Sequence, residues 1–161
     1  MKTASHSAKS GRFLIEAFVQ EVGEDLLVSI WGGTRPHIGA VGIAEARPSL
    51  QDSRSWSATS SNFTFTGHKE DRLVKEVSEV IAASLRSNVV VTAGIHWDAL
   101  TPRELLIVRN LARQLARKIC RGGSKANRAG ADVSTRAGAI STLPAARGMV
   151  PRSRHKRRSR P

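Results

Sequence analysis

The stretch VVVTAGIHWDALTPREL (residues 89–105) joins the signals of a strand, a loop and a helix. Its run of valines, closed by Gly94, is typical of a buried strand. Thr101 and Glu104 have the spacing of a capping box, and Pro102 stands at the first helical position. The stretch therefore predicts a buried strand that passes through a short loop, with the sequence IHWD, into a helix.

Four further strands are predicted ahead of this stretch. Residues 13–20 and 26–31 are apolar runs on either side of a Gly-Glu-Asp turn, and they predict a β-hairpin. Residues 37–46 form a Gly-rich run, which is typical of a buried strand that another part of the chain approaches closely. Residues 55–65 mix β-branched and aromatic residues with serines, and they predict a fourth strand with a weaker pattern.

Two amphipathic helices are predicted, over residues 69–87 and 101–119. Because the strands come first and the helices late, the order predicts an α+β fold with a mainly antiparallel sheet and both helices on one face. The other face would then lack a cover, so we expect a homodimer. The apolar positions at helical spacing are Leu73, Val77, Val80, Ile81 and Leu85 in the first helix, and Leu105, Val108, Leu111, Ala112 and Leu115 in the second.

The positive charge of the chain is concentrated near its C-terminus. Residues 1–120 hold 15 Lys or Arg and 12 Asp or Glu, whereas residues 121–161 hold 11 Lys or Arg and only Asp132 as an acid. All aromatic residues precede position 98, so the last segment has too little apolar area to offset the entropy of ordering it. We therefore predict a flexible lead over residues 1–11, one domain over residues 12–120 and a basic disordered tail over the rest.

Composition also restricts the class of protein. Cys120 is the only cysteine, which excludes an intramolecular disulfide and a cysteine-based metal knuckle and fits a reducing compartment. The first residues lack the apolar segment of a secretory signal, and no apolar run reaches the roughly 18 residues of a membrane helix. We expect a cytoplasmic protein without membrane contact. The segment RSRHKRR (residues 152–158) suits non-specific contact with nucleic acid, although a solvated charged end is the more frequent explanation of such a run.

Three clusters at predicted element ends each combine glycine with histidine. They are GGTRPHIG (residues 32–39), TGHKED (residues 66–71) and AGIHWD (residues 93–98). Binding and catalytic residues concentrate on loops that a rigid scaffold positions, so the three clusters together predict one binding site. Each cluster alone also has an ordinary structural explanation.

The first two clusters suit an anion. The Gly pair at 32–33 would expose backbone N–H groups in a turn, and Arg35 offers a fork of donors, although a tight strand connection is the more frequent explanation of such a pair. Lys69 stands at a helix start, where N–H groups and the helix dipole attract phosphate. Glu70 and Asp71 next to it complement the dipole of an ordinary helix and disfavour a neighbouring anion.

The third cluster suits a flat ligand. Trp97 between a strand and a helix could stack on a planar ring, while His96 and Asp98 bind the edge of that ring or a metal ion. The structural alternative is a core tryptophan with a satisfied histidine and a turn-capping aspartate.

A metal site is the alternative function for the same residues. His37, His68, His96 and Asp98 would converge as three histidines or as two histidines and a carboxylate. Spacings of about thirty residues carry no metal-motif information. Nucleophilic catalysis has less support, because Cys120 follows a helix without a neighbouring base in the sequence and no Gly-x-Ser-x-Gly motif is present.

The chain resembles a known family in three ordered motifs. GGTRPHIGAVGIA, TGHKEDRLVKEVSEVIA and VVVTAGIHWDALTPREL are similar to the accessory D-subunit family of gallate-type decarboxylases, the prenylated flavin chaperone LpdD-like proteins, over about residues 12–118. The resemblance implies a non-enzymatic, dimeric protein with a fold like a proteasome-assembly-chaperone subunit. It also implies binding of reduced prenylated FMN and its delivery to a UbiD-type decarboxylase, and we expect no catalytic residue and no metal in such a carrier.

The motif match carries over a set of family-like positions. We expect Lys69 or Arg35 to meet the flavin phosphate, the three histidines to bind the ring or a bridging ion, and Trp97 to form a wall. Trp97 is bulkier than the residue associated with that position, so it could narrow the pocket instead. The family-like positions are Gly32, Gly33, His37, Gly39, Gly67, His68, Lys69, Asp71, Gly94, His96, Asp98 and Thr101, and the predicted cofactor-binding set also includes Arg35 and Trp97 but not Asp71 or Thr101.

Overall fold

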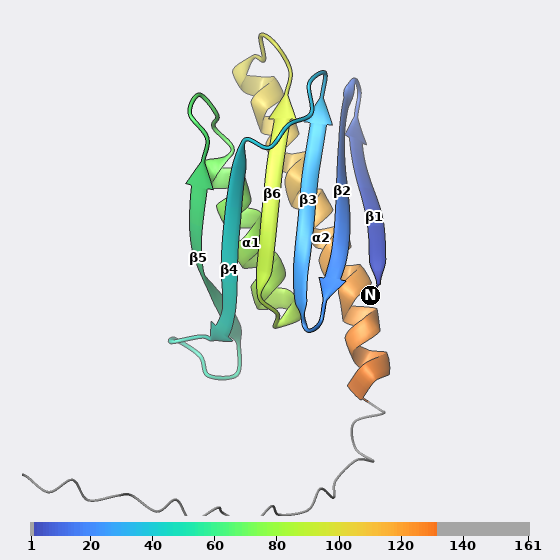
Figure 1. Ribbon diagram of the computed structural model, residues 1–161, viewed down its shortest axis with the longest axis vertical. Coiled ribbons are helices and arrows are strands. Elements are labelled where there is room, and N and C mark those ends of the chain that lie inside the picture. The colour runs from blue at the N-terminus through green and yellow to red at the C-terminus, as the bar shows by residue number, and fades with distance from the viewer. Residues whose placement is uncertain (1, 132–161) are drawn as a thin grey trace, which may run out of the picture.

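The computed structural model describes residues 2–131, with side chains described as far as Gly123. Strands precede helices in this part of the chain, apart from one strand between the two helices, so the predicted α+β class is confirmed. The elements are β1 (Thr3–Ser10), β2 (Phe13–Val22), β3 (Asp25–Gly33), β4 (Ala40–Pro48), β5 (Trp56–Thr64), α1 (Asp71–Leu85), β6 (Val89–His96) and α2 (Pro102–Ala131) (Figure 1).

The described strands form one sheet in the order β1-β2-β3-β6-β4-β5. All neighbouring pairs are antiparallel except β3 and β6, which run parallel, so the prediction of a mainly antiparallel sheet is confirmed. The late strand β6 lies between β3 and β4 and is therefore central (Figure 1). Val89 and Val91 of this strand are buried on the face that carries the helices, which accounts for two of the three valines in its apolar run.

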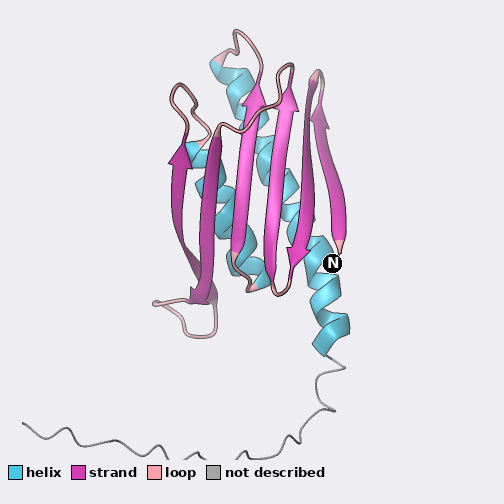
Figure 2. Ribbon diagram, in the orientation of Figure 1, coloured by secondary structure: helices cyan, strands magenta, loops and turns pink. Residues whose placement is uncertain are grey.

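Both helices lie against one face of the sheet (Figure 2). Strand β2 shows why, because its buried and exposed residues alternate with the two-residue period of a half-buried strand. Most residues of the predicted helical faces pack against the buried side, but Val80 and Leu105 are 43% and 48% exposed. The largest fully buried apolar side chains come from both layers and include Ile15, Ile30, Ile81, Leu111 and Leu115.

The Gly-rich strand β4 is approached closely by a helix, as its sequence predicted. A Cβ at Gly42 would lie 2.8 Å from the carbonyl oxygen of Val74 in α1. A larger residue at this position would therefore push α1 off the sheet.

The second face of the sheet carries exposed apolar side chains. Leu14 and Phe18 of β2, Ile43 of β4 and Phe63 of β5 are 40%, 37%, 56% and 62% exposed. The register of the strands places these residues on the face opposite the helices. We refer to it as the open face. The predicted homodimer would cover it, and that assembly remains a prediction.

The prediction of a flexible lead over residues 1–11 is wrong for most of its length. Residues Thr3–Ser10 form the edge strand β1, which pairs antiparallel with β2. Only Ala8 in this strand is buried, and the other side chains are exposed or partly exposed. The strand is ordered mainly by backbone hydrogen bonds to β2, so it lacks the hydrophobic alternation from which strands are predicted.

The helix at the C-terminal end is also longer than predicted. α2 continues to Ala131, so the expectation of a disordered tail from residue 121 is wrong for residues 121–131. Gly122 and Gly123 lie within α2, and a Cβ at Gly123 would lie 2.8 Å from the side chain of Leu85, so this glycine lets α2 approach α1. The rest of the predicted tail, residues 132–161, lies outside the described residues.

Neither helix within residues 2–131 combines the length and the apolar character that a membrane crossing requires.

Candidate functional site

The three predicted clusters meet at one end of the sheet. The connection between β3 and β4 crosses β6 near the C-terminal end of that strand (Figure 1). It is held there by two backbone hydrogen bonds, from Thr34 N to His96 O at 2.8 Å and from Gly39 N to Ala93 O at 2.8 Å. The parallel pairing of β3 with β6 ends at Gly33 and His96, so residues 32–39 and 93–98 lie side by side.

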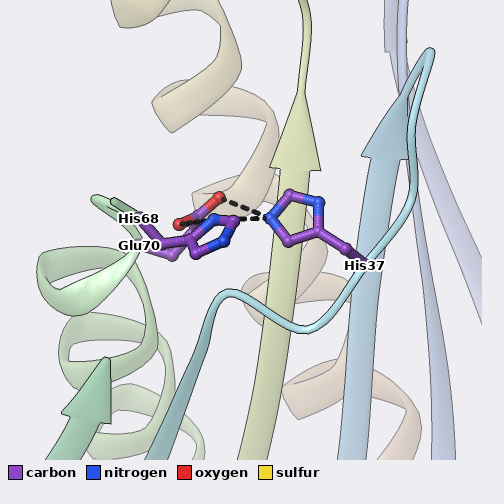
Figure 3. Close-up of side chains that lie close together, drawn as sticks. All are labelled: His37, His68 and Glu70. Carbon is purple, nitrogen blue, oxygen red and sulfur yellow. Dashed lines mark hydrogen bonds and ion pairs between the residues drawn. The ribbon is translucent and has the colours of Figure 1, made fainter. Parts of the chain in front are cut away.

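His37, His68 and Glu70 lie together, and we call them the His-Glu cluster (Figure 3). His37 Nε2 lies 2.9 Å from His68 Nδ1 and 3.6 Å from Glu70 Oε1. His68 Nδ1 lies 3.9 Å from Glu70 Oε2. The side chains are partly or largely buried, with 24%, 34% and 11% exposed. The structure thus brings two of the predicted histidines into contact.

The ring of His37 is oriented by the backbone. Its Nδ1 lies 2.9 Å from the carbonyl oxygen of Arg35, which can only accept a hydrogen bond. Nδ1 therefore carries the proton in the neutral ring, and the lone pair of Nε2 points at His68 and Glu70.

Glu70 is the site residue that sequence reasoning missed. It directly precedes α1, and its carboxylate accepts backbone N–H groups from Lys69 at 3.0 Å and from Ile95 at 3.3 Å. From the sequence, Glu70 was interpreted only as an acid that complements the helix dipole. Its contact with Ile95 could not be predicted, because it depends on the packing of β6 beside α1. The only local signal was an acid two residues after His68.

Two glycines make room for the His-Glu cluster. A Cβ at Gly39 would lie 2.6 Å from Glu70 Oε2 and 3.0 Å from His37 Nε2. A Cβ at Gly94 would collide with the backbone carbonyl of His37, where the connection crosses β6. Both positions were predicted as cofactor-binding, and their role in the structure is steric.

The remaining predicted glycines shape the backbone. Gly67 has a φ of +86° in the turn that a hydrogen bond from His68 N to Phe65 O closes, as a type II turn requires at its third position. Gly33 has a φ of +91° and faces the backbone of His96, while Gly32 is buried within β3. The amide that follows this Gly pair already binds His96 O, so the turn does not present it to an anion.

Arg35, His96 and Asp98 form a second, more exposed cluster. Arg35 Nη2 lies 2.7 Å from Asp98 Oδ1 and 2.6 Å from His96 Nε2, which itself lies 2.9 Å from Asp98 Oδ1. The hydrogen bond with His96 and the positive charge of Arg35 lower the pKa of the Asp98 carboxyl. The His96 ring lies 6.2 Å from that of His37, so the two clusters are neighbours without sharing a donor.

Trp97 does not join these clusters. Its ring meets Phe13 edge to face, with centroids 5.0 Å apart, and it packs against the hydrophobic core. This is the arrangement of the core alternative, and the expected role of Trp97 as a wall of the binding site stays a prediction. Exposed apolar side chains at this end are Ile38 in the crossing connection and the edge-to-face pair Phe63 and Phe65, whose ring centroids are 5.1 Å apart.

A groove adjoins the His-Glu cluster between the starts of the two helices. It has a volume of about 570 Å³, within the range of small-ligand sites. Lys69 and Glu70 border it on the side of the cluster. Its other lining residues are Asp71, Arg72, Leu73, Ile95, Leu100, Pro102, Leu105, Leu106, Val108 and Arg109, which combine an apolar wall with two further cations.

Comparisons with known proteins agree with the sequence motifs. A family model described as the prenylated flavin chaperone LpdD-like domain matches residues 9–123. Protein LpdD of Lactiplantibacillus plantarum is 26% identical over 116 residues, which cover 72% of this chain and 82% of the relative. A chain from the crystal structure of a chaperone complex for yeast 20S proteasome assembly aligns with a TM-score of 0.44 and 12% identity, covering 73% of this chain and 97% of that chain.

Proposed function

Because the chain belongs to the prenylated flavin chaperone LpdD-like family, we propose that it is a non-enzymatic accessory protein that binds reduced prenylated FMN. It would hold this cofactor and help to load it into a UbiD-type aromatic acid decarboxylase. The flavin supplies its chemistry in the client enzyme, and this chain supplies only a site that binds and releases it.

The convergence of the three Gly-His clusters carries this proposal. Segments that lie far apart in the sequence meet at one end of the sheet, where loops build binding sites on a rigid scaffold. The side chains at this end of the sheet have the chemical character that a planar anionic ligand requires. Arg35 and Lys69 are exposed cations for the phosphate, and the exposed rings of Phe63 and Phe65 offer the flat apolar contact first assigned to Trp97.

The adjoining groove supports the same function by its size and by its three basic residues, which outnumber the two acids Glu70 and Asp71 in its lining. Its volume of about 570 Å³ suits part or all of a flavin nucleotide. Lys69 lies between the groove and the His-Glu cluster. Its ammonium group could therefore bind the phosphate of a flavin that lies in the groove or of one that lies over the cluster. Arg72 and Arg109 are the further cations of the groove.

A carrier must release its cargo, which sets the affinity that we expect. Binding in the micromolar range corresponds to about −8 kcal/mol, enough to select the ligand without trapping it. We place the protein in the cytoplasm with the decarboxylase as its partner. A second copy of the chain covers the open face in this proposal, because the exposed apolar side chains of β2, β4 and β5 lie there.

The test is an anaerobic calorimetric titration of the full chain with reduced prenylated FMN. We expect micromolar binding, and we expect Arg35→Gln to weaken it about tenfold or more, the loss of one charge-assisted contact. The control is Arg54→Gln, since Arg54 is an exposed arginine in the β4–β5 connection with a 91% exposed side chain. The absence of binding up to about 100 μM ligand, by calorimetry and by tryptophan fluorescence, would contradict the proposal, because it leaves no affinity that a carrier could use.

Plain FMN titrated in the same way tests ligand identity. We expect weaker binding of FMN than of the prenylated form. Equal affinities would indicate a general flavin-binding protein, and they would remove the specific link to UbiD-type decarboxylases.

A nucleic-acid role of the basic tail remains a separate prediction. The segment that carries it, residues 152–158, lies outside the described residues. Deletion of residues 132–161 followed by binding measurements at low and high salt tests it, because phosphate contacts by lysine and arginine give a steep salt dependence.

A further inference from the structure

We propose that His37, His68 and Glu70 bind one divalent first-row transition-metal ion. The donor atoms are two imidazole nitrogens and one carboxylate oxygen, which lie within 4.8 Å of one another. The inference rests on the geometry of these donors and is independent of flavin binding. The metal alternative drawn from sequence used His96 and Asp98, whereas the structure places Glu70 in their position.

The donor set and its spacing fit such an ion. Two histidines with one carboxylate are used by catalytic zinc sites and by non-haem iron sites. Ligand atoms that bind one ion at about 2.1 Å lie roughly 3 to 3.5 Å from one another. In the His-Glu cluster the two nitrogens lie 2.9 Å apart, His37 Nε2 lies 3.6 Å from Glu70 Oε1, and His68 Nδ1 lies 3.9 Å from the other oxygen, Oε2. One donor atom from each residue lies within 4.8 Å of the other two, so side-chain rotations would bring all three donors around one ion.

The surrounding groups already orient the donors. A histidine that binds a metal usually donates its other N–H to a carbonyl or carboxylate. His37 does so to the carbonyl of Arg35, which leaves its Nε2 lone pair for the ion. The Glu70 carboxylate is fixed by the amides of Lys69 and Ile95. These contacts come from separate segments, so the arrangement would exist before the ion binds.

The charge of Glu70 argues against a cluster held by hydrogen bonds alone. One proton can link His37 Nε2 and His68 Nδ1 at 2.9 Å, but the carboxylate oxygens lie 3.6 Å or more from these nitrogens. Among the described residues, no lysine or arginine pairs with Glu70, although the residue is only 9% exposed. Within the described residues, its carboxylate is met by two backbone N–H groups and by two histidines that carry a charge only when protonated. A divalent cation between the three groups would supply a permanent positive charge.

The site would keep coordination positions open. His37 and His68 are about a quarter and a third exposed, so the ion would be reachable from solvent. Three protein ligands with an open position are the pattern of sites that exchange a water for an anionic ligand, in contrast to closed four-ligand structural sites.

Titration of the tag-free, metal-free full chain with Co²⁺ tests the inference, followed by calorimetry and by visible absorption. We expect one Co²⁺ per chain, with ligand-field bands of an ion bound by nitrogen and oxygen. His37→Gln and Glu70→Gln should each weaken binding about tenfold or more, because each removes a direct ligand. Circular dichroism of each variant checks that it is folded.

Two histidine variants define the ligand set. His96→Gln should leave Co²⁺ affinity unchanged, since His96 belongs to the neighbouring cluster, and a loss as large as that of His37→Gln would overturn the assignment to Glu70. His6→Gln, in strand β1, is the matched control for non-specific binding by a partly buried histidine. No uptake of Co²⁺ or Zn²⁺ by the wild-type chain up to about 1 mM would overturn the proposal altogether.

Discussion

The backbone carbonyl of His37 occupies the space that a side chain at position 94 would need. Gly94 lies in β6, and the connection between β3 and β4 crosses that strand at this point. The crossing brings His37 to the start of α1, where His68 and Glu70 lie. A glycine in the central strand is therefore a condition for the His-Glu cluster, although it contributes no side chain to it.

Gly94→Ala should displace the crossing connection. The added methyl group collides with backbone, which cannot rotate away as a side chain can, so we expect the free energy of unfolding to fall by more than about 1 kcal/mol. The His-Glu cluster would open, and Co²⁺ binding should be lost with it. Urea unfolding and Co²⁺ titration of the same sample measure the two effects.

A strained turn at the other end of the sheet provides the control for this variant. Gly23 has a φ of +64° and free space around it, so Gly23→Ala destabilises the fold through backbone strain without reaching the cluster. Its Co²⁺ affinity should remain that of the wild type. If Gly94→Ala also keeps its Co²⁺ affinity, the crossing connection does not position His37 in the way described.

The open face gives a prediction about assembly. Ile43 lies in β4 on this face and is 56% exposed, so Ile43→Asp would place a charge in the interface of the expected homodimer. Sedimentation should show a dimer for the wild type and a shift towards monomer for the variant. Leu50→Asp is the matched control, since Leu50 is 90% exposed in the β4–β5 connection and its change should leave the dimer intact. A monomeric wild type would contradict the prediction directly.

A Trp97 variant distinguishes a role in core packing from a role as a wall of the flavin site. The packing of Trp97 against Phe13 and the core predicts that Trp97→Ala lowers the free energy of unfolding by about 3 kcal/mol, as for other large core aromatics. A wall residue of the flavin site would instead lower ligand affinity with little change in stability. Urea unfolding and flavin titration at a temperature where the variant stays folded distinguish the two outcomes.

Local signals in the sequence predicted most of the fold. The hairpin of residues 13–20 and 26–31 and the capping spacing of Thr101 and Glu104 each depend on residues close together in the chain, and both are confirmed. Strand β1 was missed because its polar residues are ordered by pairing with β2, which composition does not record. The length of α2 was missed because the residues after 120 were judged by their low apolar area, which does not record the close packing of Gly123 against Leu85.

The sequence predicted which three segments build the site. It did not predict which side chains meet there, because this depends on strand pairing and helix placement. Parallel pairing of β3 with β6 sets Gly33 beside His96, and the placement of α1 sets Glu70 beside His37. One residue of shift in that register would turn His96 to the opposite face of the sheet. The contact of Trp97 with Phe13 was not predicted for the same reason, because the alternation that continues from β6 turns Trp97 away from His96 and towards Phe13.

The start of α2 provides a prediction about pH. The Glu104 side chain accepts hydrogen bonds from the backbone and hydroxyl of Thr101 and from Arg12, and these contacts lower its pKa from an ordinary value of 4.5 to about 2. The folded state therefore favours the ionised carboxylate. Its contribution to stability is complete above about pH 4.5 and is lost as the pH falls towards 2.

Glu104→Gln should accordingly destabilise the protein at pH 7 and lose that effect in acid. The midpoint of urea unfolding should lie below that of the wild type at pH 7 and pH 5, and the two midpoints should converge towards pH 3, since the wild-type carboxyl approaches its folded pKa there. Glu24→Gln, in the exposed β2–β3 turn, is the control and should change neither curve. If the difference between the urea midpoints of Glu104→Gln and the wild type stays constant from pH 7 to pH 3, the prediction is contradicted. The charge of the carboxylate would then not be what stabilises the capping box.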